Sequence, residues 1–144
     1  MSIRKLQKTD YNKRYLELLN QLKPIIRYDQ EIFNNIFEDI SNDIRHNIFV
    51  IEDNGIIVGT ITVLLESKFI YMGDKLGHIE DLVVDRSYRN KGYGGMLVNY
   101  CIDYCRENGC KKFGLCSRVN AQEFYYKKGF DVIGNYFAKY LKIY

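Results

Sequence analysis

Two adjacent carboxylates, Glu80 and Asp81, interrupt an otherwise apolar run of residues. Neighbouring residues of a strand point to opposite faces of a sheet, so a solvent-exposed face accounts for only one of these side chains. A carboxylate on the other face would be buried, and burial raises the pKa of a carboxyl group toward the range of a general base. Glu80 and Asp81 are therefore the candidates for accepting a proton.

The apolar run continues through Leu82, Val83 and Val84 and ends in a basic, glycine-rich segment. Beyond it, apolar side chains recur with the spacing of an amphipathic helix. A strand, a glycine turn and a helix N-terminus together bring unpaired N–H groups and the positive end of a helix dipole to one place, which favours an anion. The glycines allow the backbone to approach it closely. The expected anion-binding residues are Arg89, Asn90, Lys91, Gly92, Tyr93, Gly94 and Gly95.

A second group of residues, Phe124-Tyr125-x-Lys127-x-Gly129-Phe130, has the pattern of a short helix that ends at Gly129. A lone tyrosine at such a position is most often part of the core. A phenol held beside a sulfur or oxygen leaving group can instead donate its proton to it. Tyr125 is therefore the candidate general acid.

Hydrophobic patterning and turn residues indicate the elements that position these groups. Asp10 and Asp29 have the positions of helix N-caps, Pro24 ends a helix, and Asn54-Gly55 is typical of a tight hairpin turn. Gly59, inside a strand, indicates a bulge or a close approach of another element. We expect helices at 11–22, 32–44, 93–107 and 120–128, and strands at 3–8, 48–52, 56–71, 77–84, 112–116, 130–133 and 136–141.

The composition limits the class of protein. A chain of 144 residues is long enough for one domain, which we expect to span residues 1–144. No apolar run approaches the roughly 20 residues of a membrane span and no signal peptide is evident, so we expect a cytoplasmic protein. The net charge of +3 is too small to argue for nucleic acid. The four cysteines form no CxxC pair, so we expect reduced thiols and no metal site.

Together, the glycine segment and the tyrosine motif resemble the GCN5-related N-acetyltransferase (GNAT) family. The resemblance is carried by Val83-Val84, Arg89-x-x-Gly92-x-Gly94 and Phe124-Tyr125-x-Lys127-x-Gly129-Phe130. The order of the expected elements is also similar, over essentially the whole chain. The resemblance implies an α/β fold with a central mixed sheet flanked by about four helices, a single N-acetyltransferase domain, and acetyl-CoA as the acetyl donor.

In this family the glycine loop binds the pyrophosphate of acetyl-CoA, the strand before it pairs with the pantetheine arm, and the tyrosine protonates the departing thiolate. The resemblance therefore implies direct attack of an amine on the thioester in a ternary complex. Tyr125 would be the acid, and Glu80, Asp81 or a water molecule the base. The implied CoA contacts are Leu82, Val83, Val84, Arg89, Asn90, Lys91, Gly92, Tyr93, Gly94, Gly95, Cys116, Asn120 and Tyr125.

Within the family, the chain is most similar to the members that acetylate glucosamine 6-phosphate, an amino sugar phosphate on the route to UDP-N-acetylglucosamine. This similarity rests on Glu66-x-Lys68-Phe69-Ile70 and on the strand from Gly77 to Val84. The pair Glu80-Asp81 discriminates most, because most family members do not carry both acids there. The implied substrate-binding residues are Lys68, Phe69, Ile70, Tyr71, Glu80, Asp81, Leu82, Lys111, Lys112 and Lys139.

Three positions depart from the pattern of those members. Lys23 replaces a threonine, Cys116 an acidic residue and Lys139 an arginine, while Asn120 is placed to take over the CoA contact of position 116. These departures favour an alternative acceptor: another small amine, such as an aminoglycoside or a polyamine, or a protein amine. A non-catalytic acyl-CoA-binding domain is the further alternative. The family also implies a homodimer, with Tyr136-Phe137 at its interface.

Overall fold

The computed structural model describes residues 1–25 and 28–142. The chain divides into two compact units, residues 1–114 and the segment from Leu115 onward. The expectation of a single domain over residues 1–144 stays a prediction. Within the described ranges, no helix is long and apolar enough to cross a membrane.

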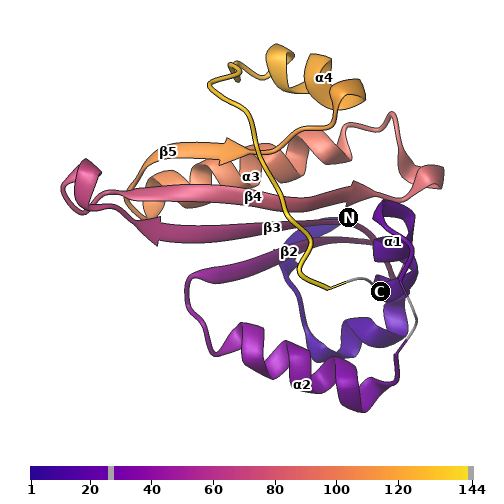
Figure 1. The fold of residues 1–144 in the computed structure, drawn as a ribbon. Helices are drawn as coiled ribbons and strands as arrows, with labels where there is room; N and C mark the ends of the chain where they lie inside the picture. The colour runs from indigo at the N-terminus through magenta and orange to yellow at the C-terminus, as the bar shows by residue number, and fades with distance from the viewer. Residues whose placement is uncertain (26–27, 143–144) are drawn as a thin grey trace. The chain divides into compact units, whose positions relative to one another are not determined.

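A five-stranded sheet organises the first unit, with its strands in the order of the sequence. The first four strands pair antiparallel. Figure 1 shows β5 running in the same direction as β4, so the sheet is mixed. The α/β class predicted from the sequence is therefore confirmed. The strands are β1 (Ser2–Lys5), β2 (His46–Asp53), β3 (Ile56–Ser67), β4 (Lys75–Val84) and β5 (Cys110–Leu115).

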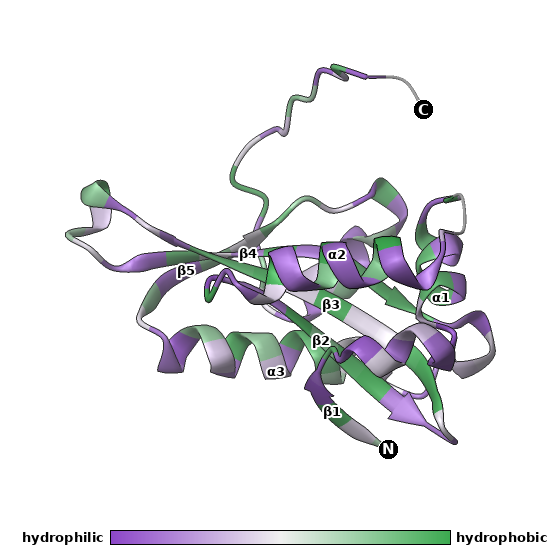
Figure 2. Cartoon of the chain, turned by 90° about the horizontal axis from the view of Figure 1, so that it is seen from below, coloured by the Kyte–Doolittle hydropathy of each residue, from purple (hydrophilic) through white to green (hydrophobic). Residues whose placement is uncertain are grey.

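Helices cover both faces of this sheet. Figures 1 and 2 show α3 on one face and α1 and α2 on the other. The α-helices of the described residues are α1 (Tyr15–Leu22), α2 (Gln30–Ser41), α3 (Tyr93–Glu107) and, in the second unit, α4 (Gln122–Lys127). Short 3-10 helices are η1 (Lys8–Lys13), η2 (Phe69–Tyr71), η3 (Arg86–Tyr88) and η4 (Val119–Ala121).

The core of the first unit follows from the alternation of apolar side chains along β2. Phe49 faces α3, where its ring lies 4.9 Å from that of Tyr100 and 5.1 Å from that of Tyr104. The next residue, Val50, lies with Tyr15 of α1 and Phe33 of α2 in the cluster on the opposite face. The apolar colour of β2 and β3 in Figure 2 reflects this burial on both faces.

Two glycines allow α3 to pack closely on the sheet. A Cβ atom at Gly77 would lie 2.5 Å from Sγ of Cys105, and one at Gly59 would lie 3.2 Å from Cδ1 of Leu97. The pairing of β2 with β3 also shifts beside Gly59. Both features expected at this glycine, a bulge and a close approach, are therefore confirmed.

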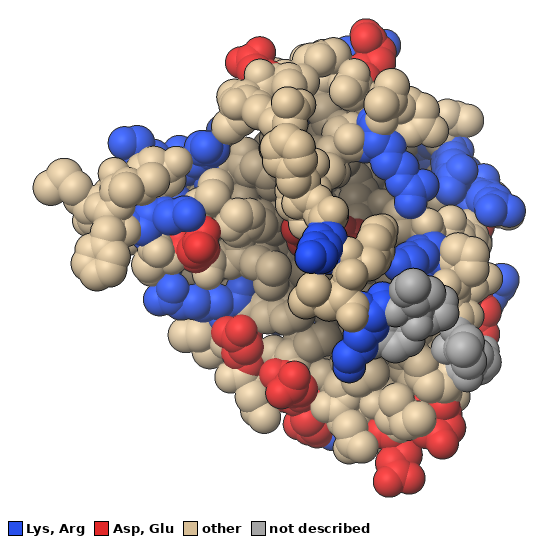
Figure 3. Space-filling view, viewed as in Figure 1, with Lys and Arg blue, Asp and Glu red and all other residues tan. Residues whose placement is uncertain are grey.

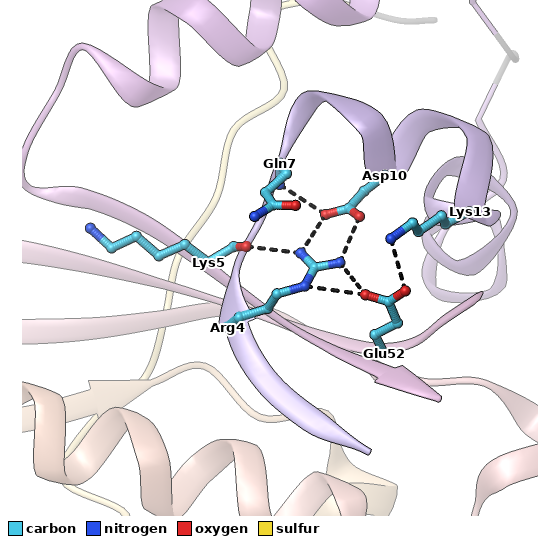
Figure 4. A network of polar contacts seen from close by, with 6 residues as sticks. All are labelled: Arg4, Lys5, Gln7, Asp10, Lys13 and Glu52. Carbon is cyan, nitrogen blue, oxygen red and sulfur yellow. Dashed lines mark hydrogen bonds and ion pairs between the residues drawn. The ribbon is translucent and has the colours of Figure 1, made fainter. Parts of the chain in front are cut away.

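The first helix differs from its prediction. It is broken at Arg14, whose φ of 65° is left-handed, so a 3-10 helix precedes α1. Asp10 is not an N-cap; it lies within η1 and is fully buried. Arg4 donates two hydrogen bonds to its carboxylate, at 2.8 and 2.9 Å, and also contacts Glu52, which in turn binds Lys13 (Figure 4). Asp10 also accepts from the backbone N–H of Gln7 at 2.8 Å, so it serves η1 as the third residue of a capping box in which Gln7 is the N-cap. The network therefore joins β1, η1 and β2.

The two strands expected at 130–133 and 136–141 are wrong. The described part of the second unit contains no strand after β5. In this terminal segment, residues 130–142, the large apolar side chains from Val132 to Leu141 are instead 63% to 89% exposed. A strand requires a neighbouring strand to pair with, and among the described residues of this unit no strand pairs with the terminal segment.

The Arg4 network gives a test of the fold. Arg4→Leu is expected to lower the free energy of unfolding by about 3 kcal/mol, because it leaves the buried Asp10 carboxylate without its cation. Urea denaturation measures this loss. In the matched control, Arg106→Leu removes an exposed ion pair with Asp103 and is expected to cost about 0.5 kcal/mol or less. Equal losses in the two variants would contradict the interpretation.

Candidate active site

The two carboxylates of β4 lie at an irregularity of the strand. Thr60 pairs with Val83 and Thr62 pairs with Glu80, so two residues of β4 lie opposite one residue of β3. Asp81, one of the two, has a left-handed φ of 52°. This β-bulge cancels the alternation of side chains, and both Glu80 and Asp81 are exposed. The expectation that one of them is buried is wrong, because it assumed a regular strand.

Beyond the bulge, β4 extends past its neighbour β5. The two strands start together, where the N–H of Lys75 donates to the carbonyl of Gly109 at 2.9 Å, but β4 has ten residues and β5 six. Figure 1 shows β5 ending well before β4 does. Among the described residues of the first unit, no strand therefore pairs with this edge of β4 at Leu82, Val83 and Val84, and the edge is open to a ligand that pairs as a strand would, except that the carbonyl of Val84 accepts from Arg89.

A loop links β4 to the N-terminus of α3. Gly92 is the N-cap of α3, with a left-handed φ of 81°, and no side chain caps the helix. The first N–H groups of the helix, at Tyr93, Gly94 and Gly95, therefore favour an anion as their partner. Arg89, Asn90 and Lys91 are exposed beside them. Figure 3 shows basic side chains on the side where Figure 1 places this loop, as well as on the opposite side of the view.

Side chains of the loop also make contacts of their own. Nε of Arg89 donates to the carbonyl of Val84 at 3.2 Å, and Nζ of Lys91 lies 4.7 Å from the ring centre of Tyr88. The Tyr93 hydroxyl donates to Asp53 at 2.7 Å, and this carboxylate raises the pKa of the phenol. Tyr93 therefore offers its backbone N–H to an anion, while its side chain anchors α3 to the β2–β3 hairpin. The sequence carries no local signal of this anchor.

The residues expected to bind the acceptor fall into two groups within the first unit. Lys68, Phe69, Ile70 and Tyr71 form the tip of the β3–β4 hairpin, where Phe69 and Ile70 are exposed. Lys68 pairs with Glu66 at 2.9 Å, and Nζ of Lys111 lies over the ring of Tyr71; Lys112 is exposed on β5.

The acids are far from this tip along the same strand. Glu80 lies five residues beyond Lys75, the first residue of β4. At 3.4 Å per residue this is about 17 Å. Within this chain the hairpin tip and the acids are therefore not brought together.

The second unit carries Tyr125, in the helix that ends as the sequence predicts. Gly129 has a left-handed φ of 84°, the N–H of Phe130 donates to the carbonyl of Tyr125, and the N–H of Gly129 donates to that of Tyr126. These are the bonds of a Schellman motif, and its apolar contact is the pair of rings of Tyr125 and Phe130, 5.6 Å apart. Burial raises the pKa of the half-buried Tyr125 phenol. Cys116, Asn120 and Lys139, also in this unit, are exposed.

Comparisons with known proteins agree with this architecture. The model of the Acetyltransferase (GNAT) family matches residues 3–130. The glucosamine 6-phosphate N-acetyltransferase of Arabidopsis thaliana is 39% identical over 141 residues, which cover 96% of this chain and 95% of that protein. The enzyme of the same name from Candida albicans is 36% identical over 132 residues, covering 90% and 88%.

Solved structures give the same result. The crystal structure of the Arabidopsis thaliana enzyme has a TM-score of 0.93 and 38% identity, covering 98% of both chains. An acetyltransferase of Trypanosoma brucei has a TM-score of 0.89 and 31% identity, covering 97% of this chain and 99% of that one. The chain belongs to the GNAT family of acetyltransferases. Both sequence relatives, and the first of the two solved structures, are named glucosamine 6-phosphate N-acetyltransferase.

The bulge at Asp81 gives a test of the site geometry. Asp81→Val is expected to lower the free energy of unfolding by about 1–2 kcal/mol, because a β-branched residue is strained at a left-handed φ. Asp81→Asn keeps a side chain that tolerates this conformation and should remain within about 0.5 kcal/mol of the wild type. Urea denaturation of the two variants decides: the same stability in both would argue against a left-handed residue at this position.

Proposed function

We propose that this protein transfers the acetyl group of acetyl-CoA to the amine of glucosamine 6-phosphate, giving N-acetylglucosamine 6-phosphate. Acetyl-CoA as the donor is supported by one observation: the N-terminus of α3 has no side-chain cap and follows a glycine loop with exposed basic residues. Such a site suits a pyrophosphate. The acceptor is supported by the names of the relatives that are 31–39% identical over most of the chain.

The residues of the first unit fit the phosphates and the pantetheine arm of acetyl-CoA. A Cβ atom at Gly92 would meet no atom within 4 Å, so the space before the helix is open to a ligand. Residues 90–95 would hold the pyrophosphate, with Arg89 beside it. The free edge of β4 at Leu82, Val83 and Val84 would pair with the amides of the pantetheine. Acetyl-CoA supplies the activated acyl group as a thioester.

Acetyl transfer requires a neutral amine and a protonated leaving group. Glu80 or Asp81, directly or through a water molecule, would accept the proton of the sugar ammonium; both carboxylates are exposed to solvent. The hydroxyl of Tyr125 would donate its proton to the CoA thiolate. A free thiol has a pKa of roughly 8.5 and a phenol about 10, so a well-placed phenol can protonate the thiolate. Holding the amine against the thioester supplies much of the remaining rate.

The phosphate of the sugar would bind lysines: Lys68, Lys111, Lys112 and Lys139 are the residues that we assign to it. A lysine is a point charge and lacks the bidentate geometry of arginine. Since Lys68 lies at the hairpin tip and the acids lie about 17 Å along β4, one chain alone does not bring both groups to the same sugar. A second copy of the chain would provide the missing group.

We therefore propose a homodimer. Two apolar surfaces support it: the hairpin tip, with Phe69, and the terminal segment, with Tyr136 and Phe137, all of which are exposed in the single chain. Exposed apolar patches of this kind mark interaction surfaces. Phe137→Glu is expected to shift the protein from dimer to monomer in sedimentation equilibrium, whereas Val119→Glu, at an exposed apolar residue outside both surfaces, should leave the dimer intact. A monomeric wild type would refute the proposal.

An assay of thiol release from acetyl-CoA with a panel of amines tests the function. We expect kcat/KM for glucosamine 6-phosphate to exceed that for glucosamine, aminoglycosides, polyamines and peptide N-termini by at least tenfold. A protein that turns over another amine better would belong to the alternative class of acceptor. A protein that binds CoA but releases no thiol with any amine would be a non-catalytic binding domain.

Tyr125→Phe tests the general acid. The variant is expected to lose at least tenfold in kcat while keeping the wild-type Kd for CoA, because it removes the proton but not the ring. The acid must be protonated, and burial raises its pKa above the ordinary value of about 10, so this group supports activity below that pH and loses it as the pH rises through the raised pKa. Unchanged kcat in Tyr125→Phe would remove the residue from this role.

A further inference from the structure

One side chain of α1 ties this helix to the start of the loop between β4 and α3. Nε2 of Gln21 donates to Oδ2 of Asp85 at 2.9 Å, and Oε1 of Gln21 accepts from the backbone N–H of Arg86 at 3.0 Å. The residues are 64 and 65 positions apart in the sequence. An amide uses one donor and one acceptor here, and among side chains of this length only glutamine offers both from its end group.

Asp85 is the point at which the loop leaves the sheet. Its N–H donates to the carbonyl of Val58 at 2.8 Å, and its Oδ1 accepts from the N–H of Ser87 at 2.8 Å. Burial acts to raise the pKa of Asp85, but the hydrogen bonds from Ser87 and Gln21 outweigh it, and the pKa lies below its ordinary value. The carboxylate is therefore charged at neutral pH, and its bond with Gln21 is a charge-assisted one.

The segment fixed in this way leads directly into the anion site. Asp85 is the N-cap of η3, residues 86–88, and Arg89 follows at once. At its other end the loop is held by the bond of Tyr93 to Asp53. We propose that Gln21 is a positioning residue for the phosphate-binding loop: it fixes the direction in which residues 86–92 leave β4, so that the N–H groups at the start of α3 face the pyrophosphate of the donor.

This inference rests on acetyl-CoA as the donor, and it predicts an effect that depends on the phosphates of the donor. A misdirected loop weakens the binding of CoA but leaves the pantetheine site on β4 unchanged. Acetyl-pantetheine carries the same thioester without the nucleotide or the pyrophosphate. Activity with this donor therefore reports on the pantetheine site alone. A variant that merely destabilised the fold would affect both donors alike.

The experiment compares variants of the full chain by calorimetry with CoA and by steady-state kinetics with both donors. Gln21→Leu is expected to raise the Kd for CoA and the KM for acetyl-CoA about tenfold, which corresponds to about 1.4 kcal/mol, the size of one hydrogen bond to a charged group. Its kcat should remain within about twofold of the wild type, and kcat/KM for acetyl-pantetheine should not change. Gln30→Leu, the same change at the exposed first residue of α2, is the matched control.

A double variant that exchanges the hydrogen-bond donor and acceptor between positions 21 and 85 tests whether CoA binding can be restored. Gln21→Glu keeps an acceptor for the N–H of Arg86 but places a second carboxylate against Asp85, so it should weaken CoA binding as well. Adding Asp85→Asn supplies an amide donor for the new carboxylate while its oxygen still accepts from Ser87. The double variant should recover most of the wild-type Kd, which a purely steric role of Gln21 does not predict.

The outcomes are distinct. Wild-type Kd for CoA in Gln21→Leu, or an equal loss of activity with both donors, would overturn the positioning role. A wild-type protein that binds CoA but does not acetylate glucosamine 6-phosphate would overturn the acceptor alone, and the Kd series would still decide the role of Gln21. A wild-type protein that binds no CoA would overturn both the donor and this inference.

Discussion

The bulge in β4 is the constraint on which the site depends. A residue inserted at Asp81 reverses the alternation of the strand, and both Glu80 and Asp81 become exposed as a result. The last residues of β4 then run past the end of β5 with an edge free for a ligand. A regular strand of the same composition would bury one acid. The exposure of the two candidate bases thus depends on where the pairing of β3 and β4 shifts.

The anion site at α3 is held by contacts from distant parts of the chain. The glycines give the loop its left-handed turn, but they provide no side chain to keep it in place. That task falls to Gln21 on α1, to the hydrogen bond of Arg89 with the end of β4, and to Asp53 at the β2–β3 turn. Each anchor lies on an element that is itself packed into the core of the first unit. The conformation of the glycine loop is therefore fixed by hydrogen bonds to the packed elements around it.

Local patterns were sufficient to predict most of the fold. The Asn54-Gly55 turn, the Asp29 cap and the helix end at Gly129 are signals within a few residues of the structure that they specify, and all three are confirmed. The predictions were wrong where the local structure depends on contacts with residues that are distant in the sequence. Asp10 has the pattern of an N-cap, but it is the third residue of a 3-10 helix whose N-cap is Gln7, and it also binds Arg4 of β1. The bulge depends on the register between two strands, and the terminal segment lacks the neighbour that a strand requires.

The Schellman motif that ends α4 links two features of the second unit. The carbonyl of Tyr125 accepts from the N–H groups of both Lys128 and Phe130, and the rings of Tyr125 and Phe130 are in contact. The first residue of the terminal segment and the phenol therefore turn together, as one rigid corner of the chain. A movement of the terminal segment would therefore also displace the ring of Tyr125, so the proposed dimer contact and the proposed proton donor are coupled through this corner.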